Sequence, residues 1–248
     1  THARNLYPSM SQEVLDQNLQ SQQELGGLLD SFDPALLTED QRMTLRILQS
    51  YMDTEEKARG LQLYHQPLAV TIGVQAQLPI LLAEYAFYTR QDIEDYLELL
   101  AGIDEYYQDI MDYEKRKADA GLMMSDRTID HIIESCESFL LTPGENFMTE
   151  TFDSRMEEVE GLTQEDKDAY RQRHAEALEQ DFVPAYQLLI DGLTALKGTG
   201  TNDGGQCGYP EGKAYYEYLV YSSTGTSYGS VDDLLEDVEY TMEDALIS

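Results

Sequence analysis

The chain has 248 residues, with 48 Asp or Glu against 16 Lys or Arg, so its formal net charge at pH 7 is −32. Such a charge repels the phosphates of nucleic acids and anionic lipid headgroups, which excludes nucleic-acid binding as a function. A hydrophobic content of 42% with 18 Tyr favours a folded globular protein over a disordered acidic tail. The acidity indicates either a solvated surface or a negative field that attracts basic peptides or cations.

The apolar runs and the cysteines exclude two further classes of protein, those that span a membrane and those held by a disulfide framework. Leu78–Ala86 is too short to cross a bilayer and contains Glu84, so we expect no membrane insertion. Two cysteines are too few for a disulfide framework. Cys136 lies in a helical pattern and is expected to be a core thiol, whereas Cys207 lies in a glycine-rich loop and is expected to be free and exposed.

The N-terminal third predicts two helices. Ser9-x-x-Gln12 and Thr38-x-x-Gln41 each have the spacing of a capping box, in which side chains at both positions satisfy free backbone amides. Apolar residues recur at helical spacing after each box, and Asp33-Pro34 marks the turn between them. The second helix is expected to close at Gly60.

The central third carries the clearest helical signal. Pro79 is tolerated near a helix start, so we expect residues 73–78 to be a non-helical entry to a buried helix. Thr89-x-x-Asp92 predicts the cap of one long helix that ends at Gly121. Its apolar stripe consists of Ile93, Leu97, Leu100, Ile103, Tyr107 and Ile110. Carboxylates that include Glu98, Glu105 and Asp109 lie mostly off this stripe and are expected to face water.

The C-terminal third continues the helical pattern. One helix is expected to begin at Ser125 or Asp126, and a second to cover residues 146–159. A third is expected to begin at the capping box Thr163-x-x-Asp166 and to end at Leu196. Two more are expected over residues 212–222 and from Ser230 onwards. Pro184 is expected to kink or divide the helix that contains it. The glycine-rich segment 198–212 follows a helix and lacks the spacing of a phosphate-binding loop, so a surface loop is the default interpretation.

These patterns predict an all-α fold, an irregular array of about eight or nine helices with long loops and little or no β structure. We expect residues 1–248 to form one helical domain, the N-terminal portion of a larger domain that is cut after Ser248.

Several stretches resemble a known family. GVQAQLP, LLAEYAFYTRQDIEDYLELL and EKRKADAGLMMSD, followed by DGLTALKGTGTNDGG and GKAYYEYLVYSSTGTS, are similar to the bacterial "domain of unknown function 885" family, in its order and over nearly the whole chain. The resemblance implies a helical, zincin-like metallopeptidase with zinc bound by a C-terminal H-E-x-x-P-G-H type signature, which this sequence lacks. It also implies an exported or lipid-anchored protein, with a cytoplasmic location as the alternative.

The residues present do not form a recognisable catalytic pattern. Zinc peptidases need two His one helical turn apart, with a Glu as base and a third ligand. The four histidines, His2, His65, His131 and His174, contain no such pair. His131 and Glu134 are interpreted as an exposed helical pair. We therefore expect no metal ligand, no catalytic residue and no cofactor in this segment, and assign zinc only to the longer parent that the resemblance implies.

The predicted function follows from both lines of reasoning. We expect a scaffold and cleft wall of a zinc-dependent peptidase, inactive alone; the alternative is a non-catalytic helical module that binds peptides or partners. Candidate substrate-binding residues are Gln75, Gln77, Lys213, Tyr215 and Tyr216. The glutamines either satisfy buried loop amides or bind an extended peptide, and the tyrosines either pack in the core or donate to a peptide carbonyl.

Overall fold

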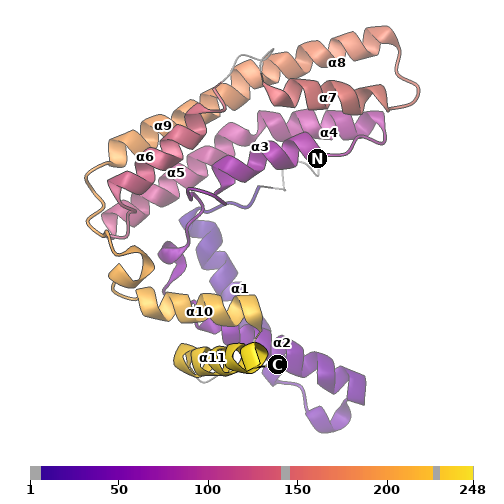
Figure 1. The fold of residues 1–248 in the computed structure, drawn as a ribbon. Coiled ribbons are helices and arrows are strands. Elements are labelled where there is room, and N and C mark those ends of the chain that lie inside the picture. Colours follow the sequence, from indigo (N-terminus) through magenta and orange to yellow (C-terminus); the bar gives the residue numbers. More distant parts are fainter. Residues whose placement is uncertain (1–6, 141–145, 226–229, 248) are drawn as a thin grey trace. The chain divides into compact units, whose positions relative to one another are not determined.

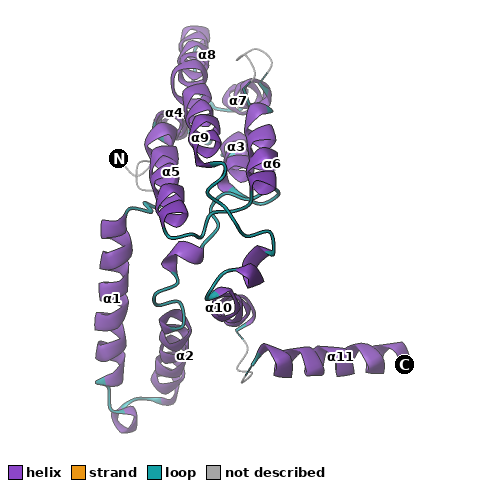
Figure 2. Cartoon of the chain, turned by 90° about the vertical axis from the view of Figure 1, so that its left-hand side faces the viewer, coloured by secondary structure: helices purple, strands orange, loops and turns teal. Residues whose placement is uncertain are grey.

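The structure is a computed structural model that describes residues 7–140, 146–225 and 230–247 (Figure 1). The chain divides into two compact units: Thr1–Ser11 with Gln66–Asp203 form unit 1, and Gln12–His65 with Gly204–Ser248 form unit 2. Every regular element in the described ranges is helical, so the predicted all-α fold is confirmed (Figure 2). That the chain is the N-terminal portion of one larger domain stays a prediction.

Unit 1 contains α3 (Val74–Glu84), α4 (Arg90–Ala101), α5 (Ile103–Asp119), α6 (Asp126–Glu137), α7 (Phe147–Glu157), α8 (Gln164–Ala177) and α9 (Val183–Leu196). Unit 2 contains α1 (Gln12–Asp30), α2 (Glu39–Glu56), α10 (Gly212–Thr224) and α11 (Val231–Ile247). Single 3₁₀ turns lie at Pro34–Leu36, Gln62–Tyr64 and Gly205–Gly208. Gly102 alone separates α4 from α5, and a single π-helical turn separates α8 from α9.

The predicted apolar stripe forms the centre of unit 1. All six of its residues are buried, and α5 packs against α9, which in turn packs against α6. The single long helix predicted here is divided at Gly102, whose φ of −96° and ψ of 3° are not helical. The stripe continues across this bend, because Leu100 and Ile103 both stay fully buried.

Helix starts follow the sequence in most places. The capping boxes predicted at Thr38, Thr89 and Thr163 are confirmed. The box predicted at Ser9 is wrong, because α1 begins at Gln12 and Ser9 lies three residues before it. The Ser9 hydroxyl instead accepts from the amide of Ser11 at 3.2 Å and donates to Asp109 at 2.5 Å.

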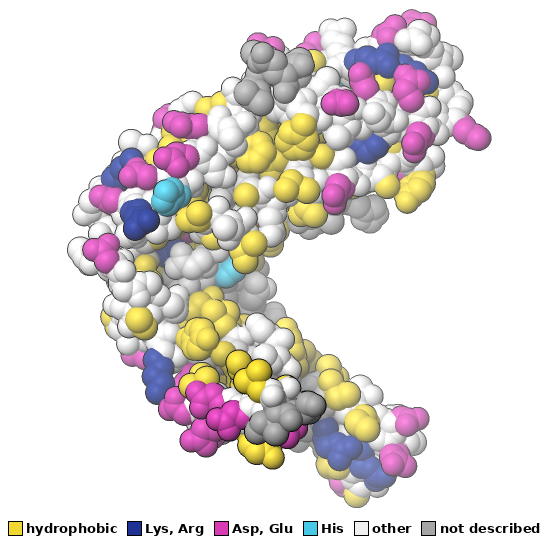
Figure 3. Space-filling model, viewed as in Figure 1, with side chains coloured by type: hydrophobic (Ala, Val, Ile, Leu, Met, Phe, Trp, Pro, Cys, Tyr) yellow, Lys and Arg dark blue, Asp and Glu magenta, His cyan; other side chains and the backbone are white. Residues whose placement is uncertain are grey.

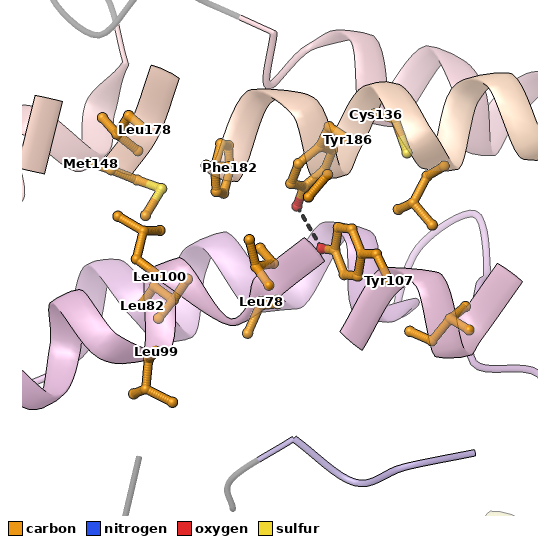
Figure 4. Packing of buried hydrophobic residues seen from close by; sticks show 14 of the residues in the cluster. Leu78, Leu82, Leu99, Leu100, Tyr107, Cys136, Met148, Leu178, Phe182 and Tyr186 are labelled. Carbon is orange, nitrogen blue, oxygen red and sulfur yellow. Dashed lines mark hydrogen bonds between the residues drawn. The ribbon is translucent and has the colours of Figure 1, made fainter. Parts of the chain in front are cut away.

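The prediction that a helix begins at Pro79 is wrong, because α3 begins at Val74 and contains Pro79. Proline has no amide hydrogen, so the carbonyl of Gln75, four residues earlier, lacks its helical donor. The Tyr186 hydroxyl on α9 donates to that carbonyl at 2.6 Å. It also accepts from the Tyr107 hydroxyl on α5 at 3.0 Å, the bond drawn in Figure 4. A tertiary hydrogen bond thus makes the proline tolerable inside the helix.

Pro184 divides its helix as predicted. A π-helical turn, Leu178–Phe182, joins α8 to α9, and Pro184 lies in the first turn of α9. The wider turn accommodates a residue that can neither donate to nor pack against the preceding carbonyls in an α-helix.

Unit 2 is built around the α1–α2 hairpin and α10, which packs on α2. Tyr64 lies at its centre: its ring contacts those of Tyr209 and Tyr215, and its hydroxyl accepts from the amide of Glu211 at 3.0 Å. No side chain described on α11 is buried.

We expect Tyr186→Phe to lower the free energy of unfolding of unit 1 by about 1–3 kcal/mol, because a buried carbonyl and the Tyr107 hydroxyl each lose a partner. In a Pro79→Ala background the loss should be smaller by about 1 kcal/mol, because the introduced alanine supplies the missing backbone amide to the Gln75 carbonyl. Urea denaturation, with hydrogen exchange to assign the transition to unit 1, measures both effects.

The matched control is Tyr88→Phe, which removes a hydroxyl from a tyrosine that is 83% exposed and should change stability by less than about 0.5 kcal/mol. Equal costs of Tyr186→Phe with and without Pro79 would contradict the proposed compensation.

Candidate functional site

Two adjoining hollows lie on unit 1 where α3, α4 and α5 meet residues 7–9. The first, called the acidic hollow, has a volume of about 310 Å³ and is lined by Tyr7, Ser9, Glu98, Ala101, Gly102, Glu105, Tyr106 and Asp109. The second, called the apolar hollow, has a volume of about 280 Å³ and is lined by Tyr7, Pro8, Val74, Gln77, Leu78, Leu81, Leu82, Tyr85, Leu99 and Tyr106.

Tyr7 and Tyr106 form the wall that the two hollows share. Their rings are stacked, with centroids 4.7 Å apart and planes inclined by 12°. The Tyr7 hydroxyl donates to the carbonyl of Leu99 at 2.9 Å. Burial raises the pKa of both phenols above the ordinary value, so both stay neutral and can donate hydrogen bonds.

The acidic hollow is negative because Glu98, Glu105 and Asp109 line it and none of its described lining residues is basic. Glu105 is exposed, whereas Glu98 and Asp109 are half-buried. Carboxylates on a partly enclosed wall focus a negative potential, which suits the side chain of Lys or Arg. The sequence predicted that these carboxylates face water but carried no signal that they line one hollow.

The apolar hollow has a buried floor and an exposed rim. Leu78, Leu82 and Leu99 are buried beneath it, whereas Leu81 at its rim is 61% exposed. On the face shown in Figure 3, hydrophobic side chains gather over the region of α3. An enclosed apolar surface with a few polar groups at its edge suits an apolar or aromatic side chain of a ligand.

The two candidate glutamines lie in different environments, although both are on α3. Gln75 is fully buried, and its Nε2 donates to the carbonyl of Ala69 at 2.5 Å. Gly73 makes room for this contact, because a Cβ there would lie 2.3 Å from the Ala69 nitrogen. Gln75 therefore holds the loop that leads into α3, whereas Gln77 is exposed and lines the apolar hollow.

The other three candidate residues lie on α10 in unit 2. Tyr215 is buried and packs against Tyr64, with ring centroids 5.7 Å apart, so its place is explained by the core. Tyr216 is 52% exposed, and Lys213 is exposed with its Nζ 3.9 Å from Glu217. A role of Lys213 and Tyr216 in substrate binding stays a prediction.

Comparison with known proteins gives the family. Residues 2–235 match the family described as "Bacterial protein of unknown function (DUF885)". The chain belongs to this family. Among curated proteins none matches it.

A solved structure has the same fold. This DUF885 chain is similar to the crystal structure of the "putative lipoprotein" from Colwellia psychrerythraea, with a TM-score of 0.80 and 14% sequence identity. The similarity covers 92% of this chain but 40% of the other one. In the described part of the chain, no helix combines the length and the apolar character needed to cross a membrane.

The zinc site that the family resemblance implies does not fit the described residues of this DUF885 chain. They contain no group of three or more His, Cys, Asp or Glu that could hold one metal ion. His131 lies on α6 with its Nδ1 3.3 Å from Glu134, and both side chains are exposed. His65 is exposed in unit 2, and His2 lies outside the described residues.

His174 belongs to an aromatic cluster that the sequence did not reveal. Its ring stacks on Phe152, with centroids 4.2 Å apart and planes parallel to within 1°, and its Nε2 lies 3.1 Å from the Tyr96 hydroxyl. Burial, with a smaller contribution from the charge of Arg155, lowers the pKa of His174 to about 3. The imidazole is therefore neutral in the folded protein.

Arg155 connects this cluster to the apolar hollow. Its guanidinium lies over the rings of Phe87 and Tyr96 and donates to the carbonyl of Leu82 at 2.9 Å and that of Tyr85 at 2.5 Å. These bonds cap the C-terminal end of α3, where the Leu82 carbonyl also accepts from the amide of Tyr85. The cluster therefore positions the end of α3 that lines the hollow.

We expect acidification from about pH 7 to pH 5 to lower the stability of unit 1 by roughly 1–2 kcal/mol through His174. The folded pKa is below the ordinary value of 6.5, so the unfolded chain takes up a proton first. This contribution to stability is complete above about pH 6.5 and is lost as the pH falls towards 3. His174→Gln, which removes the titrating group, should remove this slope in urea denaturation.

The matched control is His131→Gln, which removes an exposed histidine outside the cluster and should keep the full slope. A slope that is unchanged in His174→Gln would contradict the assignment.

Proposed function

We propose that this chain forms the substrate-binding wall of a longer zinc-dependent hydrolase of the DUF885 family, and that unit 1 binds an extended peptide. Family membership supports the comparison with zincin-like peptidases that the sequence resemblance implies. We also propose that this chain belongs to a longer protein, because its match to the similar solved protein covers 40% of that protein's chain.

The observation that carries the proposal is the pair of hollows on either side of the Tyr7–Tyr106 stack. A peptide placed across this stack would direct a Lys or Arg side chain into the acidic hollow and an apolar side chain into the other. The exposed Gln77 offers an amide for the peptide backbone. The strong negative charge of the chain would also speed the encounter with basic peptides.

The role proposed for this chain is binding and orientation of the substrate. Because the described residues do not fit zinc, the metal ligands and the general base are assigned to the rest of the longer parent. By itself the chain is expected to bind a peptide without cleaving it.

The alternative is an exported module that binds peptides or partners without catalysis. The name of the similar solved protein, a "putative lipoprotein", is compatible with export in both proposals. Both proposals share the site on unit 1. They differ in whether the full-length gene product holds zinc and cleaves peptides, which zinc analysis and a peptide-cleavage assay of that product decide.

A fluorescent peptide with one Lys two residues from one Tyr tests binding by this chain. We expect Glu105→Gln/Asp109→Asn to weaken binding at least about 10-fold at low salt, because two of the three carboxylates that face the ammonium are neutralised. Fluorescence anisotropy measures the dissociation constants. The affinity of the unmodified chain should fall as salt is added.

The matched control is Glu137→Gln/Glu179→Gln, which removes the same charge from exposed positions outside the hollows. It should bind within about 2-fold of the unmodified chain. Equal losses in the two double variants would show only a general charge effect, and would overturn the assignment of the acidic hollow as the binding site.

A further inference from the structure

A short non-helical segment of the chain lies on the face of α4 and α5 that carries the two hollows. Tyr7, Pro8, Ser9 and Met10 are called the strap. The strap makes three long-range bonds: the Tyr7 hydroxyl to the carbonyl of Leu99, the Ser9 hydroxyl to Asp109, and the Met10 carbonyl from Arg116. Each bond joins residues more than 90 positions apart in the sequence.

The strap contacts this face through side chains and one backbone carbonyl, as a bound peptide would. Tyr7 and Ser9, two residues apart, both contact the helices, whereas Pro8 between them is exposed. Pro8 disfavours the helical conformation at Tyr7, where the chain bends. The bond from Arg116 to the Met10 carbonyl is a contact that a peptide of any sequence can make.

The strap also lies where the two hollows adjoin. Tyr7 lines both of them, Ser9 lines the acidic hollow and Pro8 lines the apolar one. The Tyr7 ring covers one face of Tyr106, the face that a ligand aromatic side chain would need. A ligand that crosses from one hollow to the other must therefore displace Tyr7.

We propose that the strap occupies in cis the binding site of an extended peptide, and that this site selects an aromatic residue followed two positions later by Ser, Lys or Arg. The aromatic side chain takes the place of Tyr7 on Tyr106. The residue two positions later takes the place of Ser9 beside Asp109, where a longer basic side chain also reaches Glu105. This inference rests on the proposed function in that it names the ligand of the same site.

Exchange of the strap for another peptide is physically reasonable. The strap is non-helical and is held by one ring stack and three side-chain hydrogen bonds, and a segment held by so few contacts opens more readily than a packed helix. A tethered segment nevertheless competes at an effective concentration in the millimolar range, so it masks the site against weak ligands.

The test uses a fluorescein-labelled peptide with the sequence of the strap and Ser11, YPSMS, and the full chain with Tyr7→Ala/Ser9→Ala. We expect the peptide to bind this variant at least about 10-fold more tightly than the unmodified chain, whose own strap holds the site. A peptide with the sequence APAMS, which lacks the ring and the hydroxyl, should bind neither protein. Failure of YPSMS to bind the variant, or equal affinity for both proteins, would overturn the proposal.

Two controls separate an effect of removing the strap from an effect on folding. Tyr88→Ala truncates an exposed tyrosine of unit 1 and should leave the affinity for YPSMS at the unmodified value. Tyr7→Phe keeps the ring on Tyr106 and should keep the site masked. Circular dichroism must show the same helix content for all variants, and Tyr7→Leu replaces the double variant if that one unfolds.

The outcomes distinguish this inference from the proposed function. Tighter binding of YPSMS to the variant, without binding of the Lys-containing peptide to either protein, supports occupation of the site by the strap and overturns the selection of Lys or Arg in both proposals. Equal binding of the Lys-containing peptide to the unmodified chain and to Tyr7→Ala/Ser9→Ala supports that binding and overturns the strap.

Discussion

One carbonyl that a proline leaves without a donor determines how unit 1 is assembled. Pro79 removes the helical partner of the Gln75 carbonyl, and Tyr186 supplies a hydroxyl in its place. That hydroxyl also accepts from Tyr107, so α3, α5 and α9 meet at one buried hydrogen-bonded chain. Arg155 fixes the other end of α3 through two carbonyls. Because α3 supplies the floor and rim of the apolar hollow, the site depends on both anchors.

Charged residues lie on two sides of α5, one facing the acidic hollow and one facing the core of unit 1. Its outer side presents Glu105 and Asp109 to the acidic hollow, whereas its inner side buries Glu114 and Lys117 completely. Burial raises the pKa of Glu114 and lowers that of Lys117. The two side chains are paired, because the Lys117 Nζ lies 3.1 Å from the Glu114 carboxylate and also 3.1 Å from the Gln66 amide oxygen. Removal of one partner would leave the other charge buried alone, which is far more costly than loss of a surface pair. The carboxylates of the hollow are less constrained and can serve a ligand.

Local patterns in the sequence predicted the helices, three capping boxes and the buried stripe, because each depends on residues within a few turns. The predicted start of α3 was wrong because a tertiary hydrogen bond from Tyr186 makes Pro79 tolerable inside the helix. Tyr186 is 107 positions from Pro79 in the sequence, so no local pattern indicates this bond. Gln75 and Gln77 look alike in the sequence, but two residues turn a helical side chain to another side, and only Gln77 reaches a hollow. The stack of Tyr7 on Tyr106 joins distant residues, so no local pattern could reveal the hollows on either side of it.

The central claim is that a peptide binds unit 1 at Tyr106, between the two hollows. Its most direct measurement is an NMR titration of the chain with ¹³C-labelled tyrosine rings, with tyrosine-to-phenylalanine variants to assign the signals. A peptide with one Tyr and one Lys two positions later should shift the signals of Tyr7 and Tyr106 saturably, and leave those of the exposed Tyr88 and Tyr216 in place. Saturable shifts at other tyrosines with Tyr106 unchanged, or no shifts at all, would contradict the account.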